Sequence, residues 1–114
     1  MTHPQVVRAK ARLDRLDWYG GPVRIENVRI VHAPWFFRLP WVRRFDGFAL
    51  HRAILVRDAN PHDDLVVHEL CHVWQMQHRP LAMPLSYLRF GYANNAHERE
   101  ARAAVELTRE ERHD

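Results

Sequence analysis

The sequence predicts a single α+β domain, and three kinds of pattern lead to that class. Apolar residues recur at helical spacing near the start of the chain, two later stretches alternate between apolar and polar residues, and an apolar helix follows them. At 114 residues and 46% hydrophobic content, the chain can bury one modest core but leaves no room for a second domain. We therefore expect residues 1–114 to form one domain with a small antiparallel or mixed sheet.

Charge and cysteine usage narrow the class of protein. The formal net charge is +3, but basic residues alternate with acidic ones, so we expect no nucleic-acid partner, although an arginine-rich nucleic-acid binder stays open as an alternative. A single cysteine, Cys71, excludes an intramolecular disulfide framework and fits a reducing compartment. The chain begins without the apolar segment of a secretion signal and contains no apolar stretch of transmembrane length. We expect a cytoplasmic protein.

The first third predicts one helix and one strand. Residues 4–17 carry an apolar stripe at helical spacing, and the Gly-Gly-Pro sequence at 20–22 ends this helix. Residues 23–32 alternate apolar and polar with a change of phase near Asn27, which predicts a strand with a bulge.

An aromatic segment follows at residues 33–41. Two prolines argue against regular structure there, and we expect a loop folded over the core. A wall of a substrate cleft, a surface for a protein partner and an interfacial anchor are the alternatives, because aromatic side chains beside arginine suit all three. The aromatic residues concerned are Trp35, Phe36, Phe37 and Trp41.

A second strand is predicted at residues 48–57, after a turn at Asp46-Gly47. Its face would carry Phe48, Leu50, Ile54 and Val56. If this strand forms the sheet edge beside the site, it can bind an extended peptide by backbone pairing. His32 and His51 lie on the two predicted strands, and we do not expect them to be metal ligands.

The central helix is predicted from Asn60 to about Arg79, with Asn60 as N-cap and Pro61 at the first position. It is apolar around most of its circumference, so we expect it to be buried. Within it, Cys71 is interpreted as a small buried residue rather than a ligand, since it lies about 100° round the helix from His72.

The chemistry of this helix lies in the pattern His68-Glu69-x-x-His72. Residues i and i+4 share a helix face, so His68 and His72 can present two imidazoles to one metal ion. Imidazole suits zinc, and a hydrolytic zinc site keeps one position for water. Glu69 is placed to take a proton from that water and to deliver it to a leaving group.

A third ligand must come from elsewhere. Residues 80–93 predict a proline-broken apolar connection with at most one short helix, and a last helix opens near Asn94-Asn95 and runs to Leu107. This helix offers His97, Glu98 and Glu100, and spacing alone does not decide among them.

The two motif regions resemble gluzincin zinc metallopeptidases. The segment at 67–75 (VHELCHVWQ), followed by the segment at 95–101 (NAHEREA), is most similar to very small bacterial members of that group, including minigluzincin-like domains of unknown function. The resemblance implies a minimal zincin-like fold with an active-site helix and a C-terminal glutamate helix. It also implies Glu98 as third ligand. The aspartate that supports a ligand histidine in such enzymes falls on Arg102 here, and their usual proline falls on Ala96.

Peptidases of this type also use a donor that stabilises the oxyanion of the tetrahedral intermediate. Tyr92, Tyr87 and His97 are the candidates, and we favour Tyr92.

The combined prediction is a zinc-dependent peptidase. Zn²⁺ would be held by His68, His72 and Glu98, with Glu69 as general base and acid in the hydrolysis of a peptide or protein substrate. The alternative is a catalytically inactive, zinc-stabilised binding module that recruits a protein partner through the aromatic segment 35–41.

Overall fold

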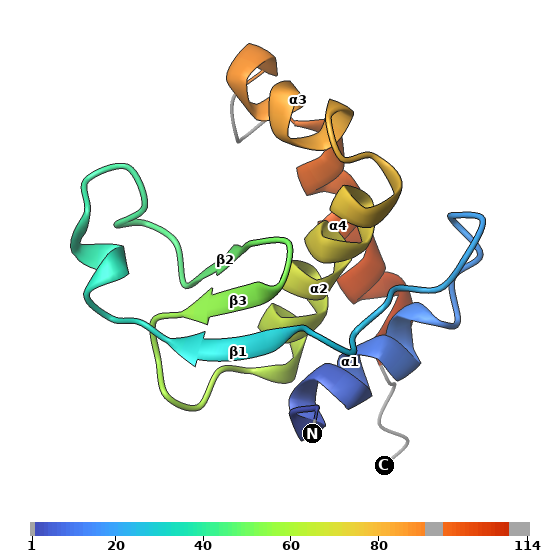
Figure 1. Ribbon diagram of the computed structural model, residues 1–114, viewed down its shortest axis with the longest axis horizontal. Coiled ribbons are helices and arrows are strands. Elements are labelled where there is room, and N and C mark those ends of the chain that lie inside the picture. The colour runs from blue at the N-terminus through green and yellow to red at the C-terminus, as the bar shows by residue number, and fades with distance from the viewer. Residues whose placement is uncertain (1, 91–94, 110–114) are drawn as a thin grey trace.

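The computed structural model describes residues 2–90 and 95–109 and has the α+β architecture that the sequence predicts (Figure 1). These ranges contain four α-helices and three strands, joined by turns and loops. In chain order the elements are α1 (Pro4–Leu13), β1 (Arg29–His32), the 3-10 turn η1 (Phe36–Arg38), β2 (Gly47–Ala49), β3 (Ala53–Val56), α2 (Asp63–His78), α3 (Ala82–Phe90) and α4 (Ala96–Thr108).

The sheet is mixed and has the strand order β1-β3-β2. β1 runs parallel to β3, with His32 opposite Val56, and β2 runs antiparallel to β3, with Gly47 also opposite Val56. β3 is therefore the middle strand. β2 is an edge strand, and it contacts α2.

Helix α2 is the buried centre of the fold, as its apolar circumference predicts. Helices α1 and α4 pack on it, and the sheet lies against it through β2 and β3 (Figure 1). The buried apolar side chains of these elements form one core cluster. Complete burial of a Val, Leu or Ile side chain contributes about 1.5–3 kcal/mol, so this core cluster is the main source of apolar stabilisation. Its fully buried members include Val66, Val67, Leu70 and Val73 of α2, Val6 and Leu13 of α1, Ile54 and Val56 of β3, and Ala101 and Ala104 of α4.

Two helix boundaries differ from the predictions. Helix α1 ends at Leu13 rather than at residue 17. Beyond it the Tyr19 ring packs edge-on against Trp74, with 4.8 Å between the ring centroids. Helix α2 begins at Asp63 rather than at Pro61. Its N-cap is His62, whose Nδ1 accepts a hydrogen bond from the Asp64 amide at 3.0 Å, in place of Asn60.

The strand predicted over residues 23–32 forms only in its second half, as β1. Residues 25–28 make a turn in which the Val28 amide donates to the Ile25 carbonyl at 3.0 Å. Before this turn, the backbone N–H and C=O of Arg24 are both bonded to the side chain of Gln77, at 2.8 and 2.7 Å. This part of the chain therefore pairs with α2 instead of with a strand.

The strand predicted over residues 48–57 is also wrong as a single element. It is a hairpin of β2 and β3, closed by a bond from the Leu50 amide to the Ala53 carbonyl at 2.7 Å. Leu50 is exposed in the turn, so it does not share the buried face of Ile54 and Val56. Gly47 is the first residue of β2 rather than part of a turn.

The last part of the chain follows the prediction closely. The connection after α2 contains one short helix, α3, and α4 begins after Asn95, whose side chain accepts from the His97 amide at 2.8 Å. None of the helices within the described ranges is long and apolar enough to cross a membrane.

Candidate metal centre

Two helices bring three ligand-type side chains together. His68 and His72 lie one turn apart on α2, with their ring centroids 4.9 Å from each other. Glu98, in the first turn of α4, faces both of them: its Oε1 lies 2.5 Å from His68 Nε2 and its Oε2 lies 3.0 Å from His72 Nε2. Each of the three residues offers one ligand atom, and these three atoms all lie within 4.8 Å of one another.

Glu98 is a buried charge held by its neighbours. Its side chain is 1% exposed, and the Tyr87 hydroxyl donates to its Oε2 at 2.8 Å. Burial raises the pKa of Glu98, but hydrogen bonds from His68 and His72 outweigh that effect and hold the pKa well below its usual range. Burial lowers the pKa of His72, and its hydrogen bond with Glu98 and the nearby carboxylates outweigh this and raise it. The carboxylate is thus stabilised by positive charge opposite it.

The donor set fits a metal ion. Two imidazole nitrogens and one carboxylate oxygen are the protein ligands of many hydrolytic zinc sites, which leave a fourth position open. The positive charge that Glu98 requires can come from protons on the two imidazoles or from a cation in their place. The group of His68, His72 and Glu98 can therefore hold a metal ion, and these residues do not by themselves fix which metal.

Glu69 lies beside this group, and its carboxylate is held close to the edge strand. The side chain is buried, and burial raises its pKa, an effect that the charges of His72 and His68 partly offset. A Cβ placed on Gly47 would come within 3.0 Å of both Cγ and Oε2 of Glu69. The absence of a side chain at Gly47 therefore leaves room for Glu69 against β2, and a larger residue would force a small shift.

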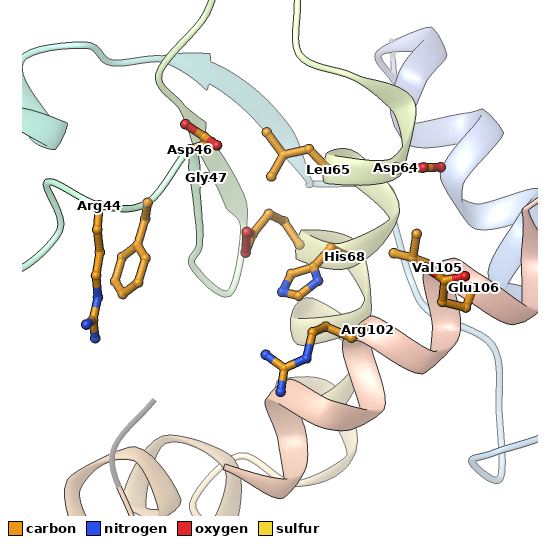
Figure 2. A pocket seen from close by; sticks show the side chains of 11 residues that line it. Arg44, Asp46, Gly47, Asp64, Leu65, His68, Arg102, Val105 and Glu106 are labelled. Carbon is orange, nitrogen blue, oxygen red and sulfur yellow. The ribbon is translucent and has the colours of Figure 1, made fainter. Parts of the chain in front are cut away.

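A cavity of about 370 Å³ gives access to His68 and Glu69. Figure 2 shows His68 on α2 with Arg102 of α4 below it, while Arg44 lies across the opening on the segment that leads into β2. The wall thus combines the edge-strand side of the sheet with one face of α4. The remaining lining residues include Phe45, Asp46, Gly47, Asp64, Leu65, Val105 and Glu106.

The structure separates the three candidate third ligands. Glu98 meets the histidines, whereas Glu100 accepts hydrogen bonds from the Tyr19 hydroxyl and from Gln75 Nε2. His97 Nδ1 lies 3.0 Å from the Ser86 hydroxyl and its Nε2 faces Arg79, and burial together with the Arg79 charge lowers its pKa.

Other predicted residues are placed as follows. Tyr92 lies outside the described residues, so its proposed role as oxyanion donor stays a prediction. Tyr87 is an alternative for that role, and its hydroxyl donates a hydrogen bond to Glu98. His32 contacts the Arg57 carbonyl and His51 is exposed in the hairpin turn, so neither belongs to the group. Cys71 is a free buried thiol.

The aromatic segment is divided between core and surface. Phe37 is buried, and Phe36 packs against Phe48 of β2 with 5.3 Å between the ring centroids. Trp35 and Trp41 are 65% and 70% exposed. Any partner surface on this segment therefore consists of the two tryptophans rather than of all four aromatic residues.

One residue that contacts the candidate ligands was not singled out from the sequence. Gln75 Oε1 lies 2.7 Å from Nδ1 of His72, three residues earlier on the same helix. The i, i+3 spacing of these two residues puts them on one face, and a polar residue on a buried helix was the signal that could have found it.

Comparison of the chain with models of protein families, with curated proteins and with solved structures gave no match. The resemblance to gluzincins therefore stays an expectation drawn from the two motifs.

Proposed function

We propose that the protein is a zinc-dependent peptidase that hydrolyses peptide bonds at the His68, His72 and Glu98 group. One observation carries the proposal: the two histidines of α2 and the glutamate of α4 converge within hydrogen-bond distance, beside a second buried carboxylate that lines a cavity. A site with only a structural metal does not require that second carboxylate.

The residues divide the work as follows. Zinc, when bound, lowers the pKa of a water molecule to roughly 7 and polarises the carbonyl of the substrate. Glu69 accepts the proton from that water and transfers it to the nitrogen of the leaving amine. The close approach of Gly47 and the burial of Glu69 limit the space open to the carboxylate, which favours a defined position for proton transfer.

Metal content and cleavage, measured on the same samples, test the proposal. Wild type and the variants His68→Ala, Glu69→Gln and His51→Ala are purified without a histidine tag, analysed for metals by mass spectrometry and incubated with a peptide library. We expect about one zinc ion per chain in wild type, its loss in His68→Ala, and its retention without cleavage in Glu69→Gln. His51, an exposed histidine of the hairpin turn, is the matched control and should behave like wild type. Wild-type protein without zinc would refute the proposal.

A second function is favoured by the exposure of Trp35 and Trp41. In that case the metal stabilises a binding module, and the two tryptophans contact a protein partner. The same experiment separates the two functions, because the binding module retains zinc in wild type and in Glu69→Gln but cleaves nothing in either.

A further inference from the structure

Gln75 joins His72 to a chain of buried hydrogen bonds between α2 and α4. Its side chain is fully buried, and both ends of its amide are bonded. Oε1 lies 2.7 Å from His72 Nδ1, and Nε2 donates to the His97 carbonyl at 2.8 Å and to Glu100 Oε1 at 3.2 Å. Glu100 in turn accepts from the Tyr19 hydroxyl. The chain of contacts thus runs from His72 through Gln75 and Glu100 to Tyr19.

The partners of the amide fix its orientation. A backbone carbonyl and a carboxylate both lie beside one end, and neither can donate, so that end must be the NH₂ group. The other end is therefore the carbonyl oxygen, which can only accept. His72 Nδ1, which faces it, must then carry a hydrogen.

The orientation of Gln75 has a direct consequence for His72. With the hydrogen on Nδ1, the nitrogen available to a metal ion is Nε2. This is the atom that lies 3.0 Å from Glu98 Oε2, on the side of the candidate ligand group. Because the Gln75 side chain is fully buried and bonded at three points, it also restrains rotation of the imidazole ring.

We propose that Gln75 is the positioning residue of the metal site, that it holds His72 in the tautomer that binds metal through Nε2, and that Glu100 and Tyr19 hold Gln75 in turn. This inference depends on the proposed metal site. As a neutral acceptor, Gln75 orients the ligand without adding a second negative charge beside it. Outer partners of ligand histidines commonly change metal affinity by about 10–100-fold.

The experiment compares two glutamines of the same helix. Gln75→Met removes the acceptor at nearly constant volume. Gln77→Met is the control, because among the described residues Gln77 forms side-chain hydrogen bonds only with the backbone of Arg24, near the surface. Zinc affinity of each apo-protein is measured by competition with a chromogenic chelator. We expect binding about 10–100-fold weaker than wild type in Gln75→Met and unchanged binding in Gln77→Met.

Unfolding of the apo-proteins in urea separates a positioning role from a structural one. If Gln75→Met lowers the free energy of unfolding but binds zinc as tightly as wild type, the inference is overturned and the proposed metal site stands. If wild type itself does not bind zinc, both fail. Should Gln75→Met not fold, Tyr19→Phe tests the far end of the chain, and there we expect a weakening below about tenfold.

A spectroscopic measurement tests the tautomer directly. Long-range ¹⁵N–¹H NMR spectra of the zinc-loaded wild type report which ring nitrogen of His72 carries a hydrogen. We expect hydrogen on Nδ1 and metal on Nε2. Metal on Nδ1 of His72 would overturn the inference whatever the affinities are.

Discussion

Two clusters of charged side chains connect α2 to other parts of the fold, and they differ in burial and in the type of cation. At the start of α2, Asp64 pairs with Arg12 of α1 at 2.8 Å and with Arg109, which follows α4, at 2.9 Å. In the middle of α2, Glu98 of α4 pairs with His68 and His72. The side chain of Asp64 is 24% exposed, and that of Glu98 is 1% exposed.

The difference indicates what each cluster is for. Arginine keeps its charge at every accessible pH, and a partly exposed pair contributes up to about 1 kcal/mol to stability. A carboxylate as buried as Glu98 costs several kcal/mol to desolvate, and apolar residues would stabilise the fold at least as well. Its partners are imidazoles, which can exchange a proton for a metal ion. The first cluster is thus explained by stability, whereas the second is a group that can hold a metal ion, as the proposed function expects.

The largest expected effect comes from the same chemical change made in each cluster. Glu98→Gln and Asp64→Asn both replace a carboxylate by an amide of nearly equal size. Glu98→Gln removes the anionic ligand, so zinc affinity should fall by more than about 100-fold, while Asp64→Asn should leave it unchanged. Chelator competition on the two apo-proteins measures both values. Equal affinities in the two variants would remove the distinction between the clusters.

Gly47→Ala tests whether the position of Glu69, beside the buried cluster, matters for catalysis. The added methyl group would lie 3.0 Å from Glu69 Cγ and Oε2, so this side chain must move by a fraction of an ångström. Because proton transfer depends on the position of the base, we expect kcat to fall by about tenfold with zinc content retained. Steady-state kinetics on the best peptide from the library measures this. Loss of zinc in this variant would mean that Gly47 helps to position the metal ligands rather than the general base, Glu69.

The helical half of the fold was predictable because its information is local. The apolar circumference of α2 predicts a buried helix, and the i, i+4 histidines share a face on any helix. Helix α4 begins just after Asn95, close to the predicted start, and the Asn95 side chain caps it. Spacing did not separate Glu98 from Glu100, because the choice depends on how α4 is rotated against α2. In the structure Glu98 faces the histidines and Glu100 faces Tyr19.

The sheet was predicted less well, because tertiary contacts override its pattern. The hairpin turn at His51-Arg52 contains no Gly, Pro or Asn, so the sequence predicts one continuous strand across it. Arg24 pairs with the side chain of Gln77, which no alternation can reveal. The partner of His72 was missed for a different reason, since its i, i+3 contact is local and the polar Gln75 on a buried helix was the available signal. The resemblance put a supporting aspartate at Arg102, which is exposed at the cavity, whereas Gln75 makes the contact with His72.

The smallest expected effect concerns the exposed cluster and its pH dependence. Burial raises the pKa of Asp64, but hydrogen bonds from Arg12 and Arg109 outweigh this and hold the pKa below its usual value. A group whose pKa is lower in the folded protein than in the unfolded chain adds stability above the unfolded pKa, and that stability is lost as the pH falls toward the folded value. The position of Asp64 in the first turn of α2 adds a favourable interaction with the helix dipole.

Asp64→Asn should therefore lower the free energy of unfolding by about 1 kcal/mol at pH 7 and by nearly the same amount at pH 5. Below about pH 4 the difference from wild type should shrink, because Asp64 is increasingly protonated in the unfolded chain and then in the folded protein. Urea unfolding of both apo-proteins at pH 7, 5 and 3 measures the difference, and effects of other groups cancel because they are shared. A difference that grows on acidification would mean that Asp64 is held by something other than its arginine partners.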